Sequence, residues 1–215
     1  IPYVDSCAQF WMRVYDSTYG GFYTNVDKFG NQILYGGVAY KNLVSQSRDA
    51  YGFTRAYMLT GNETYLRMAR SALNFMYQHA WDSTRGGWYS TLDRFGTPRS
   101  PGENKTAFDQ HYALLGIATS YEATRDTNDW QWLMRGYQNN ETRLWENNPQ
   151  YYGYFDYGSY DWNTRLNKSF NATVDAITTH VLYLYLMTGD NVYRTRLLQL
   201  TDNILRRIVP TVDQM

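Results

Sequence analysis

The sequence contains a single cysteine, only three histidines and no excess of charge of either sign in its 215 residues. The lone Cys7 excludes an intrachain disulfide and a cysteine-based metal cluster, and the scattered histidines form no metal motif, so we expect no metal and no cofactor. Lysine and arginine together number 20, as do aspartate and glutamate, and a neutral chain lacks the basic field that binds nucleic-acid phosphates. No run of about 18 apolar residues occurs. We therefore expect neither nucleic acid nor a membrane as a partner.

Aromatic residues, in contrast, are abundant, with 22 tyrosines and 7 tryptophans. Aromatic rings stack on sugar rings, but they also fill hydrophobic cores, and core filling is their commoner role. The composition alone therefore permits a carbohydrate-binding protein without demonstrating one.

A fifteen-residue motif occurs twice, at residues 16–30 and 82–96, with an offset of 66 residues. The first copy reads Asp-Ser-Thr-Tyr-Gly-Gly-Phe-Tyr-Thr-Asn-Val-Asp-Lys-Phe-Gly, and the second reads Asp-Ser-Thr-Arg-Gly-Gly-Trp-Tyr-Ser-Thr-Leu-Asp-Arg-Phe-Gly. A Gly-Tyr-Phe sequence at 153–155 follows after a further 66 residues. Each copy combines a Gly-Gly turn, a short aromatic strand and a second turn, which predicts small β-hairpins between helices.

Apolar residues at helical spacing predict seven helices, at about 3–15, 40–59, 62–79, 105–124, 128–145, 171–187 and 191–208. The helices repeat at about 64 residues, which places Tyr57, Tyr121 and Tyr185 at equivalent positions. Each repeat therefore consists of an inner helix, an outer helix and a hairpin. This alternation is typical of an all-α fold of the α/α toroid type, in which a pocket lies at one mouth of the ring.

Seven helices do not close such a ring, because six inner–outer pairs need twelve, and the missing five would add on the order of 150 residues. An open half-ring would also expose the apolar sides of its inner helices, which a soluble monomer avoids. We therefore expect residues 1–215 to be a single α/α toroid domain that is incomplete at its C-terminus. Its expected partners include the rest of the barrel or, through self-association, a second copy of the chain.

Short motifs follow one another in order along nearly the whole chain. They are Phe10-Trp11, Asp16 with Gly20-Gly21-Phe22-Tyr23, Lys41 with Gln46-Ser47-Arg48, His79-Ala-Trp-Asp82 with Gly86-Gly87-Trp88-Tyr89, Lys105 with Gln110, Asp161-Trp162, Lys168-Ser-Phe-Asn171 and Leu184-Tyr185. Together they resemble the N-acylglucosamine 2-epimerase family, which includes cellobiose 2-epimerases and aldose–ketose isomerases. The resemblance implies an (α/α)6 barrel and an isomerase that moves a proton beside a sugar carbonyl.

The resemblance also implies which residues act. Family members use histidines on inner helices as acid and base, together with an arginine that holds or polarises a sugar oxygen. Arg48 lies at the position of that arginine. The family's Lys-Ser-Met-Asn motif is matched at residues 168–171, but Asp175 stands where the family has a histidine, and His180 lies one and a half turns further on. The candidate catalytic residues are therefore Arg48, His111, Asp175 and His180.

The 64-residue repeat equates His111 with Ser47 and Asp175, which predicts three polar residues at one level of the ring, beside Arg48. A histidine satisfied within the core is the alternative for His111. The candidate substrate-binding residues are Asn171, Trp88, Trp162 and Tyr112. Hairpin packing explains the tryptophans as well as sugar stacking does.

Five acceptor triplets for N-linked glycans occur, at Asn62, Asn104, Asn140, Asn167 and Asn171. If they are used, these asparagines face solvent and the protein is secreted. Asn62 and Asn140 also suit helix N-caps, so the alternative is a cytoplasmic protein in which the triplets have no role.

Three functions agree with these observations. The first is a secreted sugar 2-epimerase or aldose–ketose isomerase that acts on a mono- or oligosaccharide. The second is a glycoside hydrolase or lyase, since such enzymes share the barrel, but hydrolysis needs two paired carboxylates. The third is a non-catalytic sugar-binding or structural glycoprotein, because one fold serves many functions.

Overall fold

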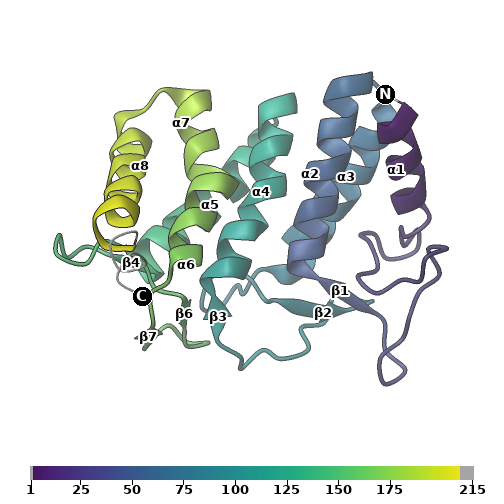
Figure 1. Cartoon of the computed structure of the whole chain (residues 1–215). Coiled ribbons are helices and arrows are strands. Elements are labelled where there is room, and N and C mark those ends of the chain that lie inside the picture. Colours follow the sequence, from purple (N-terminus) through teal and green to yellow (C-terminus); the bar gives the residue numbers. More distant parts are fainter. Residues whose placement is uncertain (1, 209–215) are drawn as a thin grey trace.

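The computed structural model describes residues 2–208, which form seven continuous helices joined by hairpins (Figure 1). Three of these helices include a π-helical segment, labelled η. The helical elements are α1 (Pro2–Met12), α2 (Leu43–Thr60), α3 (Glu63–Phe75) with η1 (Met76–Ala80), α4 (Ala107–Thr124), α5 (Thr127–Arg143), α6 (Phe170–Ala176) with η2 (Ile177–Val181) and α7 (Leu182–Thr188), and α8 (Asn191–Asn203) with η3 (Ile204–Ile208). The strands are β1 (Tyr40–Asn42), β2 (Thr91–Asp93), β3 (Lys105–Thr106), β4 (Trp145–Glu146), β5 (Gly153–Tyr154), β6 (Tyr157–Gly158) and β7 (Arg165–Leu166).

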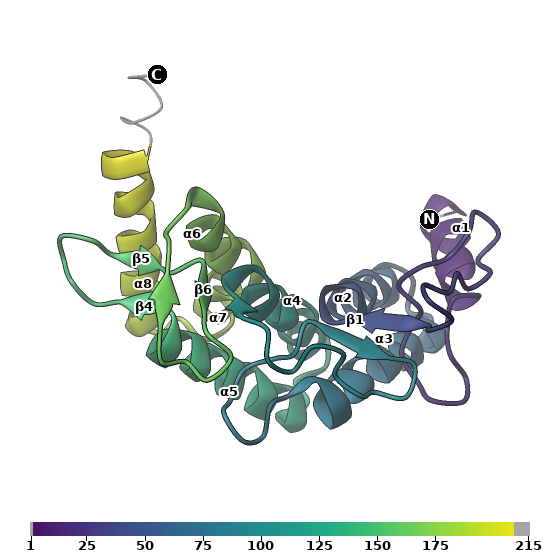
Figure 2. The same cartoon turned by 90° about the horizontal axis from the view of Figure 1, so that it is seen from below.

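The helices lie in two layers that curve into an arc (Figure 2). The inner layer consists of α2, α4 and the continuous helix α6–η2–α7. The outer layer contains α3 and α5, and α1 and α8 stand at the two ends of the arc. Helix α2 packs against α3 and α4, while α4 also packs against α5 and α6. The inner helices therefore line the concave side of the arc.

The ends of the inner helices follow from local sequence signals. The side chains of Asn42 and Thr106 accept hydrogen bonds from amides in the first turns of α2 and α4, which satisfies donors that have no partner within the helix. At the other ends Gly61, Arg125 and Gly189 adopt the left-handed backbone, with φ of 70°, 57° and 69°, which stops each helix. These three stops lie 64 residues apart and mark the repeat.

Buried lysines fix the first two hairpins to the inner helices. Lys41 Nζ lies 3.1 Å from the Asp16 carboxylate, and Lys105 Nζ lies 2.7 Å from that of Asp82. All four side chains are at most 3% exposed. Burial by itself would raise the pKa of Asp16, but hydrogen bonds from Arg94, Lys41 and other groups outweigh it and hold that pKa well below its usual range.

A glutamine of each of these inner helices completes the hairpin. Gln46 accepts the amide of Phe22 at 2.8 Å and donates to its carbonyl at 2.6 Å, and Gln110 pairs with Trp88 in the same way at 2.8 and 3.0 Å. A Cβ at Gly21, where φ is 68°, would lie 2.6 Å from the Gln46 side-chain oxygen. Both the left-handed backbone and the close approach therefore require glycine in this turn.

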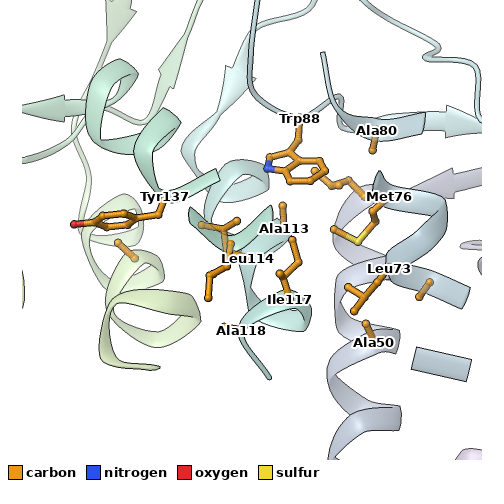
Figure 3. Close-up of a cluster of buried hydrophobic side chains, with 14 of the residues drawn as sticks. Ala50, Leu73, Met76, Ala80, Trp88, Ala113, Leu114, Ile117, Ala118 and Tyr137 are labelled. Carbon is orange, nitrogen blue, oxygen red and sulfur yellow. The ribbon is translucent and has the colours of Figure 1, made fainter. Parts of the chain in front are cut away.

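The hydrophobic core lies between the two layers, as Figure 3 shows. Leu73 and Met76 enter it from the outer layer, Leu114 and Ile117 from α4, and Trp88 from the second hairpin, and all five are fully buried. In the part of the chain that the structure describes, no helix has both the length and the apolar character to cross a membrane.

The predicted α/α toroid is confirmed, and each predicted helix is found with its ends shifted by only a few residues. The hairpins differ from the prediction. Their aromatic segments form single bridges, Tyr15 with Phe22 and Trp81 with Trp88, because glutamine side chains take up the neighbouring backbone groups. Regular pairing instead joins successive repeats, since β1 runs antiparallel to β2.

Candidate functional site

Three side chains from the three inner helices form a row on the concave side, here called the concave row: Arg48 of α2, Tyr112 of α4 and Asp175 of α6. Arg48 is exposed, and its guanidinium carbon lies 4.7 Å from the centre of the Tyr112 ring and 6.0 Å from that of Phe108. Asp175 is 8% exposed, and its charge interacts with that of Arg48. A cation, a phenol and a carboxyl group are thus brought to one surface.

The register of the third inner helix explains this row and corrects the prediction from the repeat. Helices α2 and α4 have 18 residues each, whereas the third inner helix runs from Phe170 to Thr188 and has one more. The C-terminal stops are 64 residues apart, but the N-cap Ser169 follows the N-cap Thr106 by only 63. Before η2, Asp175 is therefore equivalent to Tyr112 and not to His111.

The electrostatic state of the row suits proton exchange. Burial raises the pKa of Asp175 to about 6, and the positive charge of Arg48 opposes this rise without cancelling it. Among the described residues Arg48 forms no ion pair, so its guanidinium is available to an oxygen of a ligand. The row therefore combines an anion-binding group with a carboxyl group that titrates near neutral pH.

His111 and His180, both predicted to be catalytic, do not reach the concave side. Both are fully buried, and His111 Nδ1 lies 3.0 Å from His180 Nε2, so they share a hydrogen bond inside the core. The ring of His111 also packs edge-on against Tyr154 at 4.6 Å. The alternative reading of a core histidine is the one found, because position 111 faces the neighbouring helix rather than the lumen.

The buried histidine pair is neutral. Burial lowers the pKa of His111 to about 3, and burial together with the charge of His111 moves the pKa of His180 well below its usual value. Asn140 Nδ2 lies 3.3 Å from His111 Nδ1. His111 Nε2 and His180 Nδ1 have no hydrogen-bond partner among the described residues. The pair is thus a buried polar cluster with unused bonding capacity.

The predicted tryptophans are structural. Trp88 is fully buried in the core, where its ring meets Trp81 at 4.9 Å, so it is not positioned to stack on a sugar. Trp162 is 7% exposed, donates its indole N–H to the carbonyl of Gly86 at 3.0 Å and covers Lys105. Both rings pack the second hairpin, the alternative that the sequence left open.

The remaining predicted residues divide by exposure. Asn171 is exposed in the first turn of α6, one turn before Asp175. The glycan acceptors Asn62, Asn104 and Asn167 are also exposed. Asn140 is fully buried and contacts the carbonyl of Gln110, so its prediction as a glycan acceptor is wrong for the folded protein. Its helical position turns it toward the core.

One feature near the row was not predicted. A cavity of about 600 Å³ lies between α1 and α2, lined by Trp11, Phe53 and Leu59 and also by Arg48 and Asp49. Burial raises the pKa of Asp49 to about 8. The repeat held a usable signal, since the equivalent residues one and two repeats later are alanines of the core.

The described residues contain no group of three or more histidine, cysteine, aspartate or glutamate side chains placed to hold a metal ion. The chemistry that this part of the chain offers is therefore that of its own side chains. Proton transfer and the binding of hydroxyl or carbonyl oxygens are within reach of the concave row.

Comparison with known proteins places the chain. The model of the family N-acylglucosamine 2-epimerase (GlcNAc 2-epimerase) matches residues 16–214. The cellobiose 2-epimerase of Bacteroides fragilis is 28% identical over 155 residues, which are 72% of this chain and 38% of that protein. The chain thus matches well under half of this relative's length.

Solved structures share the fold. A cellobiose 2-epimerase from Spirochaeta thermophila superposes with a TM-score of 0.83 at 22% identity, over 97% of this chain and 56% of that one. A D-mannose isomerase superposes with a TM-score of 0.77 at 22% identity, over 96% and 53%. These structures are (α/α)6 barrels, so the arc is about half of such a barrel. Because the family model covers most of the sequence, the chain belongs to the N-acylglucosamine 2-epimerase family.

Proposed function

We propose that the chain belongs to a sugar 2-epimerase or aldose–ketose isomerase and contributes one wall of its active site. The concave row is the observation that carries the proposal, because it places Arg48 and Asp175 on the face that becomes the lumen of a complete barrel. The names of the relatives, cellobiose 2-epimerase and D-mannose isomerase, support an aldose with a free reducing end as the substrate.

The proposed reaction begins at the open-chain aldose. A base removes the proton from C2, and the electron pair of that C–H bond forms a C1–C2 double bond while the carbonyl oxygen takes up negative charge or a proton. Return of a proton to the opposite face of C2 gives the epimer, and delivery to C1 gives the ketose. Each outcome balances without an oxidant or a cofactor.

Within this scheme each member of the row has a role. The Arg48 guanidinium donates hydrogen bonds to the carbonyl oxygen and stabilises the charge that develops there. Asp175 exchanges a proton with the substrate or accepts a hydrogen bond from its hydroxyl, and its pKa of about 6 keeps both protonation states populated near neutral pH. Tyr112 holds the Arg48 guanidinium against its ring.

The decisive experiment measures deuterium incorporation at C2 of free aldoses in heavy water with the full-length protein. We expect exchange with at least one of cellobiose, mannose, glucose and their N-acetyl forms. Asp175→Asn should slow the exchange by about 10²–10⁴-fold and Arg48→Gln by about 10²–10³-fold, because each removes one transition-state group. Thr178→Ala, on the exposed side of the same helix, serves as the matched control. Absence of exchange with every sugar would refute the proposal.

Hydrolysis is not favoured by the carboxylates of the described residues. Asp109 bonds to the hydroxyls of Ser90 and Thr106, and Asp161 bonds to Ser159 within a turn. Neither is left to pair with Asp175 across the concave side. The two-carboxylate arrangement of a glycoside hydrolase is thus not assembled in this part of the chain.

We further propose that the protein is secreted and carries N-linked glycans. The exposure of Asn62, Asn104, Asn167 and Asn171 supports this, because an acceptor must be accessible to be glycosylated. The unfilled cavity between α1 and α2 supports a further partner on the concave side, either the rest of the barrel or a second copy. Both remain predictions.

A further inference from the structure

The third inner helix differs from the other two by one residue, and this residue is accommodated in η2. A π-helical segment is the usual result of inserting one residue into an α-helix, and such insertions are frequent at functional sites. We propose that η2, held by the His111–His180 hydrogen bond, is a positioning device that keeps Asp175 in the concave row. The catalytic meaning of this device rests on the proposed function, but its geometry does not.

Two registers meet at η2. The first, before the segment, aligns Asp175 with Tyr112 of α4 at an offset of 63 residues, as the N-caps require. The second, after the segment, aligns His180 with Gly116 at an offset of 64, as the C-terminal stops Arg125 and Gly189 require. One helix therefore satisfies both alignments only by carrying an extra residue between them.

The second register serves the contact between neighbouring inner helices. Between α2 and α4 this contact is made by Ser47, whose hydroxyl accepts the amide of Gly116 at 2.9 Å. Between α4 and the third inner helix the equivalent positions are occupied by His111 and His180, which meet at 3.0 Å. The histidine pair therefore fixes the C-terminal half of the third helix to α4 in the same place as the serine–glycine contact does one repeat earlier.

The first register serves the lumen. An α-helix turns by about 100° per residue, so a shift of one residue rotates a side chain off the face that it occupied. Without the insertion and with His180 still against His111, Asp175 would take the position of His111 and face the neighbouring helix. With Asp175 still in the row, His180 would leave its partner. A helix shortened by one residue cannot keep both contacts.

The test compares deletion of Thr178 with Thr178→Ala in the full-length protein. Thr178 lies within η2 and is exposed, so its side chain contributes little to packing. Two NMR readouts report the two registers: the carboxyl ¹³C titration of Asp175, with and without Arg48→Gln, and the imidazole ¹⁵N signals of the histidine pair. Neither readout requires turnover.

In the native chain and in Thr178→Ala, Arg48→Gln should raise the Asp175 midpoint by about half a pH unit, because a nearby positive charge is removed. The histidine pair should show one shared hydrogen bond. In the deletion variant we expect either the loss of the Arg48 effect or the loss of that hydrogen bond. Retention of both would overturn the proposal.

A second pair of variants covers the case in which the deletion variant does not fold. His180→Leu keeps the length of the helix but removes the hydrogen bond, whereas His180→Gln retains a group that can bond to His111. If the pair positions Asp175, the Arg48 effect on its midpoint falls in His180→Leu and is preserved in His180→Gln. An unchanged effect in His180→Leu would show that the pair only stabilises the core.

The two proposals fail separately. If the native protein exchanges no deuterium at C2 while the titrations behave as described, the proposed function is wrong and the positioning device stands. If exchange occurs and the deletion variant keeps both registers, the function stands and the device is wrong.

Discussion

The two buried imidazoles of His111 and His180 determine how single residues of this protein respond to pH. Each is neutral in the folded state because burial lowers its pKa, to about 3 for His111 and well below the ordinary value for His180. Unfolding returns both to water, where they bind protons below about pH 6.5. The unfolded state therefore gains protons that the folded state does not, and stability falls as the pH decreases below 6.5.

We predict that acidification from pH 7 to pH 5 lowers the free energy of unfolding by on the order of 2 kcal/mol through His111 alone. Urea unfolding at several pH values measures this slope, and the double variant His111→Gln/His180→Gln should flatten it. Asp175 acts with the opposite sign: the folded state keeps its proton up to about pH 6, so its ionisation costs stability as the pH rises from about 4 to 6.

Asp175→Asn is the control for that opposing contribution. It should make the loss of stability on acidification steeper, because the compensating protonation is removed. Equal slopes in the native chain and in the double histidine variant would contradict the prediction.

At the scale of elements, the attachment of each hairpin to its inner helix depends on a buried ion pair. Lys105 and Asp82 are 3% and 1% exposed and lie 2.7 Å apart. Burial lowers the pKa of Lys105, and its partner opposes this. Removal of the lysine alone leaves a buried carboxylate without its countercharge, whereas removal of both charges does not.

Lys105→Ala should therefore lower the free energy of unfolding by about 3–5 kcal/mol, as expected when one partner of a buried pair is lost. Asp82→Asn/Lys105→Met should cost clearly less. The matched control is Arg206→Ala, which breaks the exposed pair of Arg206 with Asp202 and should cost less than about 1 kcal/mol. Denaturant titration measures all three, and equal costs for the buried and exposed pairs would refute the interpretation.

The elements themselves were predictable, because their signals are local. Gly61 and Gly189 stop helices through left-handed backbone, and the apolar spacing of α3 and α8 follows one helical turn. The one-residue difference between the inner helices was not predictable with the same certainty. It leaves composition and periodicity almost unchanged and becomes visible only when Ser169 and Gly189 are seen as the two ends of one helix.

At the scale of the whole molecule, the arc has one inner flank without a neighbour. A Cβ at Gly116 would lie 2.4 Å from the Ser47 carbonyl oxygen of α2, so glycine permits the close contact of two inner helices there. Gly52, one repeat earlier, has no atom within 4 Å of the equivalent position among the described residues. The same seat is thus filled on α4 and open on α2.

Glycosylation gives a prediction for the molecule as a whole. Directed into a eukaryotic secretory pathway, the folded protein should carry glycans only at Asn62, Asn104, Asn167 and Asn171, because these are exposed and Asn140 is buried. Mass spectrometry before and after enzymatic deglycosylation measures this. A glycan on Asn140 of correctly folded protein, or no glycan on any of the other four, would contradict it.

The amino-acid sequence by itself determined the α/α toroid, the division into inner and outer helices and the location of Arg48 on an inner helix. Those features depend on helical spacing, turn glycines and a repeat of about 64 residues, all of which are local or periodic. Only the tertiary structure decided which polar side chains face the lumen. Asp175 lies there and His111 does not, because one inserted residue rotates a helix by about 100° while the pattern along the chain stays nearly the same.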